Sequence, residues 1–158
     1  MSQMKIYFTT SARGDERIFN NSTHIHNSII ELGHTHLDDF RSDMDQKKVY
    51  SDTFLNKKER YINAVKYIQK ADVIILEVST HSLTMGYLLN LSLEKNKPVI
   101  LLHTKNHLPA FAEGIENSKL QIWEYSKKDI NSVLEESINQ AKKELTSRFN
   151  LFLSGNQY

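Results

Sequence analysis

The fold class of this chain can be predicted from one stretch, Ala71-Asp72-Val73-Ile74-Ile75-Leu76-Glu77-Val78. Its residues are β-branched or aliphatic without polar alternation, apart from Asp72 and Glu77 near the two ends. A continuous apolar run of this length is typical of a strand that is buried on both faces of a parallel sheet. The stretch therefore predicts a central strand.

The residues that follow predict a βαβ unit. A polar turn over 79–85 leads through Gly86 into a leucine-rich helix from Tyr87 to Asn96, and a second apolar strand opens at Pro98. Because leucines lie on most sides of this helix, we expect it to be largely enclosed. In open parallel sheets the ligand crevice lies at the carboxyl ends of the strands, so the turn should line a site.

Strand and helix patterns alternate through the rest of the chain. The predicted segments are a strand over 4–10, a helix that ends at Gly33, a short strand over 34–37, a helix marked by Phe54, Tyr61, Val65 and Ile68, an edge strand over 120–125 and a helix with an apolar stripe from Ile130 to Leu145. This alternation predicts a doubly wound, flavodoxin-like α/β domain, with a five-stranded parallel sheet in the order 2-1-3-4-5 and helices on both faces.

We expect one domain over residues 1–147, followed by a tail over 148–158. The tail segment Phe149-Asn150-Leu151-Phe152-Leu153 is too apolar for a free terminus, so it should pack on the domain or on a second subunit. Residues 38–52 are charged and have no hydrophobic period, which predicts a loop over the site.

Composition excludes several classes of partner. Twenty basic and 19 acidic residues give a net charge of +1, so no overall field attracts nucleic acid or an anionic membrane. The 158-residue chain has no cysteine, no apolar run of membrane-spanning length and no signal-peptide pattern at its amino end. We therefore expect a cytoplasmic protein without disulfides.

Small polar residues follow the first and third predicted strands and suggest a phosphate cradle. Ser11 and Ser82 precede helices whose free amide groups attract an anion, and Arg13 beside Gly14 adds a forked cationic donor. The alternative is that both serines only cap helices while Arg13 is a solvated surface charge. The pattern alone leaves both interpretations open.

The histidines do not predict a metal site. His34 and His36 share one face of a strand, but the spacing fixes no third ligand, and His24 and His26 point to different sides of a helix. We expect neither a metal nor a cofactor.

Glu77 is the acidic residue that most needs an explanation, because a carboxylate inside an apolar strand must be paired, protonated or facing a crevice. Its place at the carboxyl end of the strand favours the crevice over a structural ion pair. Asp72, at the opposite end, is interpreted as structural. Trp123 and Tyr125 share one strand face and could stack on a base, although core or interface packing is the default interpretation.

The chain resembles the nucleoside 2-deoxyribosyltransferase superfamily, and most closely its 2′-deoxynucleoside 5′-phosphate N-hydrolase branch. The resemblance runs from about Lys5 to Ile138. It rests on Ile6-Tyr7-Phe8-Thr9-Thr10-Ser11-Ala12-Arg13-Gly14, Ala71-Asp72-Val73-Ile74-Ile75-Leu76-Glu77-Val78, Ser82-Leu83-Thr84-Met85-Gly86-Tyr87, Asn96-Lys97-Pro98-Val99 and Ser118-Lys119-Leu120-Gln121-Ile122-Trp123-Glu124-Tyr125.

The resemblance implies a homodimer, or a larger oligomer built from dimers, that binds a nucleotide. It implies that Ser11, Arg13 and Ser82 hold the 5′-phosphate and that Ser118 reaches the same phosphate from the neighbouring subunit. Tyr7 falls where the family places an aromatic residue near the sugar and the base.

Two acids of the family are missing here. The family follows Gly-Tyr with a glutamate that attacks the anomeric carbon, whereas Gly86-Tyr87 is followed by Leu88. A second family carboxylate, on the helix before the central strand, corresponds to Ala64. Neither leucine nor alanine can attack carbon, carry negative charge or transfer a proton, and cleavage of a glycosidic bond needs such groups.

Three hypotheses follow. The first is a catalytically degenerate binding module for a nucleoside 5′-monophosphate or a similar phosphorylated ligand. The second is an N-glycosidase or deoxyribosyltransferase with a relocated carboxylate, for which Glu77 and Asp38 are the candidates. The third is an interaction protein with a vestigial pocket, in which the apolar tail engages a partner.

Overall fold

The computed structural model describes residues 2–11, 16–37 and 57–155, and within these ranges five parallel strands form one sheet. In spatial order the strands are β2 (Thr35–His36), β1 (Lys5–Thr10), β3 (Val73–Glu77), β4 (Val99–Thr104) and β5 (Leu120–Tyr125). The helices are α1 (Glu16–Glu31), α3 (Lys57–Lys70), α4 (Leu83–Glu94), α5 (Ala110–Glu113) and α6 (Ile130–Gly155). The predicted fold class and strand order are confirmed.

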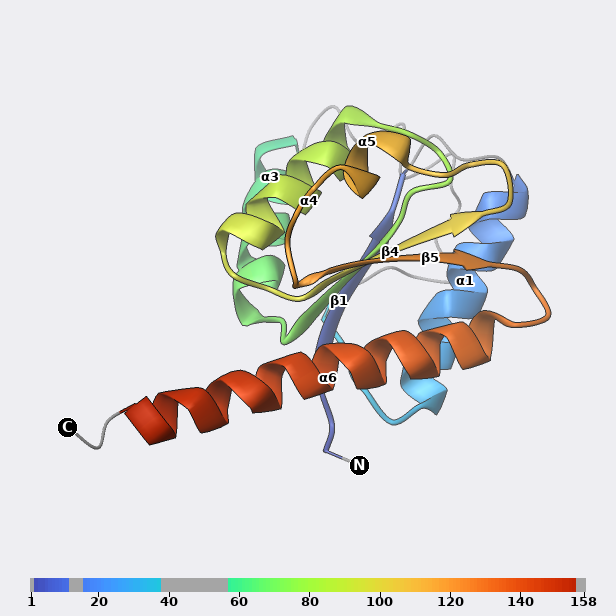
Figure 1. Ribbon diagram of the computed structural model, residues 1–158. Helices are drawn as coiled ribbons and strands as arrows, with labels where there is room; N and C mark the ends of the chain where they lie inside the picture. The colour runs from blue at the N-terminus through green and yellow to red at the C-terminus, as the bar shows by residue number, and fades with distance from the viewer. Residues whose placement is uncertain (1, 12–15, 38–56, 156–158) are drawn as a thin grey trace.

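Helices cover both faces of the sheet, with α1 and α6 on one face and α3 and α4 on the other (Figure 1). The α1–α6 cluster consists of the buried residues Met4, Ile6, Phe8, Ile25, Ile29, Val73, Ile75, Ile100, Leu102, Tyr125, Ile130, Leu134, Ile138 and Ala141. The α3–α4 cluster consists of Tyr7, Ile68, Ala71, Ile74, Leu76, Val78, Met85, Leu88, Val99, Leu101 and Ala112. Successive residues of each strand therefore enter opposite clusters, as strand geometry requires.

The central strand is buried along its whole length, as its apolar run predicts. All five residues of β3 are buried, and the strand pairs with β1 on one side and β4 on the other. The helix-terminating glycine and the helix-capping residues predicted from the sequence also occur at the helix ends. Gly33 follows α1 with a φ of 85°, a conformation that suits glycine, and Ser126 and Asp129 exchange hydrogen bonds with the backbone at the start of α6.

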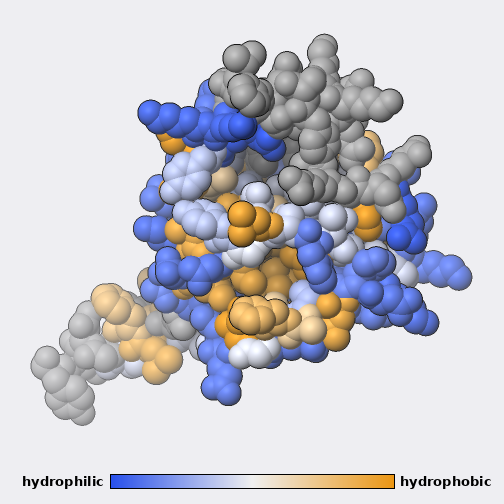
Figure 2. Space-filling model, turned by 90° about the horizontal axis from the view of Figure 1, so that it is seen from above, coloured by the Kyte–Doolittle hydropathy of each residue, from blue (hydrophilic) through white to orange (hydrophobic). Residues whose placement is uncertain are grey.

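Two features of the predicted third helix are wrong. The helix α4 begins at Leu83 rather than Tyr87, because Ser82 caps it and lets the first turn form earlier in the chain. It is also not largely enclosed. Only Met85, Leu88 and Ser92 are buried, Leu83 is 92% exposed, and apolar side chains lie among polar ones on the upper face of the molecule (Figure 2).

The last helix extends far beyond the sheet. The 26 residues of α6 span about 39 Å at 1.5 Å per residue, and Figure 1 shows its carboxyl end projecting away from the domain. The predicted boundary between residues 147 and 148 falls inside this helix. Phe149, Leu151 and Phe152 are 64–69% exposed, so they do not pack on their own domain, while packing on a second subunit stays a prediction.

None of the helices in these described ranges is both long and apolar enough to cross a membrane.

Candidate functional site

The ends of three neighbouring strands bring the predicted cradle segments to one edge of the sheet. Thr10 at the end of β1 pairs in register with Glu77 at the end of β3, and Glu77 pairs with Leu102 near the end of β4. The residues that follow these strands therefore lie side by side at the carboxyl edge. Ser11 follows Thr10 directly and is buried, and Ser82 follows Glu77 by five residues.

Ser82 has the local geometry of a helix cap. Its backbone is extended (φ −149°, ψ 152°), and its Oγ accepts a hydrogen bond of 3.2 Å from the backbone N–H of Met85. Ser82 therefore caps α4, as the capping interpretation predicts, and its hydroxyl keeps its own proton for donation to a ligand. The N–H groups of the first turn of α4, together with that hydroxyl, can face an anion.

Arg13, Gly14 and the candidate acid Asp38 lie outside the described residues. Gly86 is an exposed residue of α4, and a Cβ built on it would meet no atom within 4 Å in the described chain. The glycine is therefore not required by close packing within the part of the chain that the structure describes.

Glu77 is the centre of a buried hydrogen-bond network. Its Oε1 accepts from the backbone N–H of Ser79 at 3.2 Å, from the Ser79 hydroxyl, and from the Tyr125 hydroxyl at 3.1 Å. Its Oε2 accepts from Thr10 Oγ1 at 3.2 Å. Thr104, at the end of β4, donates its backbone N–H (2.8 Å) and its hydroxyl (3.1 Å) to Ser79 Oγ.

Glu77 lies on the opposite face of the sheet from Leu88 and Ala64, the residues that the resemblance places at the family's acid positions. Because Val73 and Ile75 of β3 belong to the α1–α6 cluster, strand alternation directs Glu77 to that face, where it meets Tyr125. Leu88 belongs to the α3–α4 cluster, and Ala64 packs against the same cluster. The fully buried Glu77 is therefore directed away from Leu88, and both of its carboxyl oxygens accept hydrogen bonds.

Tyr7 lies in the same cluster as Leu88, and Ala64 packs against this cluster. Tyr7 is buried in this α3–α4 cluster, and its ring centroid is 5.7 Å from that of Tyr67. The structure thus brings together Tyr7, Leu88 and Ala64, which the resemblance assigns to the sugar end of the site. The described side chains that pack in this cluster are mainly apolar.

Burial raises the pKa of the Glu77 carboxyl above its ordinary value of 4.5, and the hydrogen bonds from Ser79, Tyr125 and Thr10 offset only part of the increase. The oxygen nearest to Thr10 receives the fewest donors. Burial, followed by the neighbouring Glu77, likewise raises the pKa of Tyr125.

This shift predicts a pH-dependent stability. The folded state holds the Glu77 proton more tightly than the unfolded chain, so its contribution is fully present below pH 4.5 and is lost as pH rises through the folded pKa. The slope is at most about 1.4 kcal/mol per pH unit. Glu77→Gln should remove this dependence. Urea unfolding of both proteins between pH 4.5 and 8 measures the difference, and parallel curves would contradict it.

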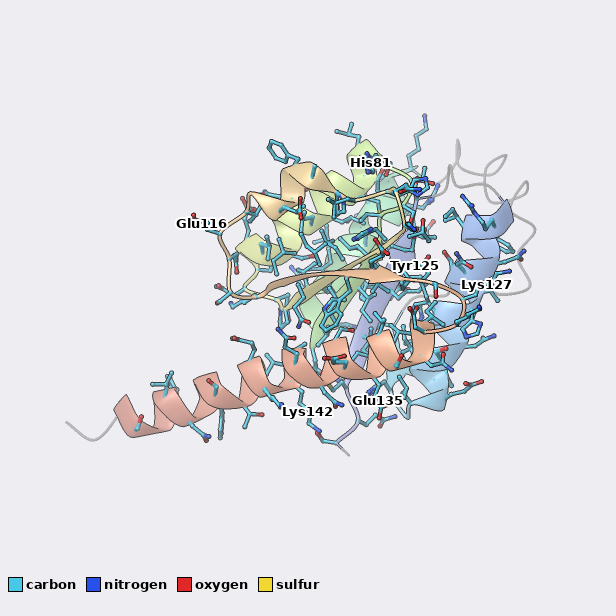
Figure 3. The ribbon with its side chains drawn as sticks, turned by 45° about the vertical axis from the view of Figure 1, so that its right-hand side comes forward. His81, Glu116, Tyr125, Lys127, Glu135 and Lys142 are labelled. Atoms are coloured by element: carbon cyan, nitrogen blue, oxygen red, sulfur yellow. The ribbon has the colours of Figure 1, made fainter. Side chains whose placement is uncertain are left out.

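Ser118 lies at the opposite edge of the sheet. It is exposed and precedes β5, next to Lys119, whose Nζ donates to the carbonyl of Asn96 just before β4. Figure 3 shows Glu116 and Tyr125 at opposite ends of β5, so residues before this strand are far along the sheet from the carboxyl edge. Within one chain Ser118 does not join Ser11 and Ser82, and its contribution from a neighbouring subunit stays a prediction.

Other polar residues singled out in the sequence serve the fold. Asp72 accepts from the backbone N–H of Lys5 at 2.8 Å, which confirms its structural interpretation. Trp123 and Tyr125 pack in or against the α1–α6 cluster, so the default interpretation is also confirmed for them. His34 is buried and accepts from the backbone N–H of Met4, and burial lowers its pKa. Within the described ranges no three His, Cys, Asp or Glu side chains are placed to hold a metal ion.

Sequence reasoning did not find the partners of Glu77. A signal exists, because Thr10, Glu77, Thr104 and Tyr125 are each the last residue of their strand and each carries a side-chain oxygen. In a parallel sheet the last residues of neighbouring strands lie close together, so these four side chains could have been grouped in advance.

Two relatives with similar sequences are nucleotide hydrolases by name, although no family model matches the chain. The 5-hydroxymethyl-dUMP N-hydrolase of Rattus norvegicus is 27% identical over 88 residues, which cover 53% of this chain and 51% of that protein. A protein of Thermofilum pendens named as a 2′-deoxynucleoside 5′-phosphate N-hydrolase is 27% identical over 137 residues, 84% of this chain and 91% of that one. The chain thus spans about half the length of the rat protein that it matches.

Two solved structures have the same fold. The CMP N-glycosidase of Clostridium botulinum superposes with a TM-score of 0.59 at 11% identity. The superposition covers 83% of this chain and 98% of the glycosidase chain. The 2-deoxyribosyltransferase of Bacillus psychrosaccharolyticus superposes with a TM-score of 0.55 at 18% identity. This superposition covers 82% of this chain and 89% of the transferase chain. At these identities the structural likeness establishes the shared fold.

Proposed function

We propose that this chain binds a nucleoside or deoxynucleoside 5′-monophosphate without cleaving it. The premise is that its relatives and structural neighbours fit the nucleoside 2-deoxyribosyltransferase superfamily. The names of the relatives support a phosphorylated nucleoside as the ligand class. The phosphate end of the proposed site consists of Ser11, Arg13 and Ser82. The convergence of the turns after β1 and β3 supports this part of the proposal.

One observation supports the absence of cleavage. Leu88 and Ala64, which stand at the family's two carboxylate positions, lie in or against the apolar α3–α4 cluster. An oxocarbenium-like transition state needs a negative charge near the anomeric carbon and a proton for the leaving base. Hydrocarbon side chains supply neither.

An active N-glycosidase is the second candidate, and the printed activities of both relatives favour it. It needs an acid other than residues 64 and 88. Glu77 is buried on the other face of the sheet, so Asp38 is the better remaining candidate in this hypothesis. A third candidate, an interaction protein with a vestigial pocket, is favoured only by the exposed apolar end of α6.

A neighbouring copy completes the proposed site. The resemblance implies a homodimer in which Ser118 of one subunit approaches the phosphate held by the other. The position of Ser118 at the amino edge of its own sheet supports this arrangement, because the serine can meet a phosphate at a carboxyl edge only in another subunit.

Thermal unfolding with and without ligand tests the proposal. A deoxynucleoside 5′-monophosphate should raise the Tm, and the gain in unfolding free energy is about 2.7 kcal/mol at a ligand concentration 100 times Kd. The matching nucleoside without phosphate should give a much smaller shift, and Arg13→Ala should abolish most of the shift. Chromatography of the same mixtures should show no free base.

Lys143→Ala is the matched control for the lost charge. Lys143 is exposed on α6, away from the carboxyl edge, so this variant should keep the full ligand-induced shift. Absence of any shift with the wild type would contradict nucleotide binding. Release of base by the wild type would contradict the degenerate interpretation and favour the enzyme.

A further inference from the structure

The hydrogen-bond network around Glu77 has no role in the function proposed above. Its members come from four strands and their following turns, and Glu77, Ser79 and Tyr125 are all buried. Asn21 of α1, also buried, interacts with the Tyr125 hydroxyl. One carboxyl group thus connects the carboxyl ends of β1, β3, β4 and β5, and through Tyr125 it reaches α1.

Such a network is costly unless it is fully satisfied. Burying a carboxyl group without partners costs several kcal/mol, whereas an apolar residue at position 77 would have continued the core of β3 at no such cost. The network also does not bring opposite charges together. Its effect is therefore geometric, since each hydrogen bond fixes the end of a strand at the edge where a turn begins.

The fixed residues are neighbours of the cradle. Thr10, which bonds to Oε2 of Glu77, directly precedes Ser11. Ser79, which bonds to Oε1 through both its backbone and its hydroxyl, opens the four-residue connection to the Ser82 cap of α4. A shift of either residue would change the separation between the two serines.

The charge of the Glu77 carboxyl group affects whether an anion can bind nearby. Burial raises the pKa of Glu77, which widens the pH range over which the carboxyl group is neutral. A neutral carboxyl group can hold both turns without repelling a phosphate, which an ionised carboxylate in a medium of low dielectric constant would do.

We propose that Glu77 is a positioning residue of the phosphate cradle, holding Thr10 beside Ser11 and Ser79 ahead of Ser82 in the separation that a phosphate needs. This inference rests on the proposed function, because it assumes that a nucleoside 5′-monophosphate is the ligand. It assigns Glu77 no contact with that ligand and no part in bond cleavage.

Calorimetric titration of variants with a deoxynucleoside 5′-monophosphate tests the inference. Thr10→Val and Tyr125→Phe each remove one hydrogen bond to Glu77, and each should weaken binding about tenfold, the equivalent of about 1.4 kcal/mol. Glu77→Leu removes all of them and should weaken binding further. Glu77→Gln has the shape and the donor of a protonated glutamate, so it should bind within about threefold of the wild type.

Ile75→Val is the matched control for general loss of stability. Ile75 is buried on the same strand and the same face, and its shortening should lower the Tm without removing any hydrogen bond of the network. Its affinity should equal that of the wild type even where its Tm falls as far as that of Tyr125→Phe.

The outcomes separate this inference from the proposed function. Wild-type binding together with unchanged affinity in Thr10→Val and Tyr125→Phe would overturn the positioning role and leave the proposed function intact. A loss of affinity in Ile75→Val equal to that in Tyr125→Phe would also overturn it, because stability alone would then explain the effect. No binding by the wild type would overturn both.

Discussion

Leu88→Glu is expected to lower the free energy of unfolding by about 3 kcal/mol at pH 7. Leu88 is 5% exposed and lies in the α3–α4 cluster with Tyr7 and Met85, so a carboxylate in its place would lose its water and gain no charged partner from these side chains. The loss should be smaller at pH 5, because protonation removes the buried charge. Urea unfolding at the two pH values measures both effects.

Leu88→Met provides the comparison for this variant. Methionine is apolar and has a similar volume, so it should cost less than about 1.5 kcal/mol at either pH. A Glu variant that is as stable as the wild type at pH 7 would show that side chain 88 reaches water. The apolar interpretation of the sugar end, and with it the support for a site without catalytic acids, would then be wrong.

Leu134→Ala should cost about 3 kcal/mol of unfolding free energy, the second large effect that the structure predicts. Leu134 is fully buried in the α1–α6 cluster, where the first half of α6 covers the sheet. Removing its side chain leaves a cavity between helix and sheet that the surrounding strands can fill only in part. Denaturant unfolding at fixed pH gives the value.

Leu151→Ala on the same helix is the matched control. Leu151 is exposed, so the same change should alter the unfolding free energy by no more than about 0.5 kcal/mol in a monomer. Measurements at low and high protein concentration extend the test. A cost that appears only at high concentration would indicate that the end of α6 packs on a second copy, whereas equal large costs for both leucines would contradict the exposed position of residue 151.

The sheet could be predicted from the sequence because its signals are local and strong. The run from Val73 to Leu76 is too continuously apolar for an edge strand, and Pro98 marks the start of the next strand. The burial of α4 could not be predicted in the same way. Leucines on most sides of a helix do not reveal which of them meet the sheet, and the structure buries Met85 and Leu88 while Leu83 faces solvent.

The site was predicted less completely than the fold, because the face of the sheet to which each strand residue points was not taken into account. Glu77 was correctly singled out as unusual, but its face of the sheet follows from the alternation that also directs Val73 and Ile75. Which face α4 covers depends on contacts between residues far apart in the sequence. Leu88 and Glu77 are only eleven positions apart in the sequence. They nevertheless lie on opposite faces of the sheet.

The projecting end of α6 affects how the size of this protein should be measured. A rod that protrudes from a compact body increases friction in solution, so an 18.4 kDa monomer should elute from a sizing column earlier than a sphere of equal mass. An early elution volume is thus no evidence of pairing by itself. Light scattering or sedimentation equilibrium, which report mass independently of shape, are the appropriate ways to count subunits.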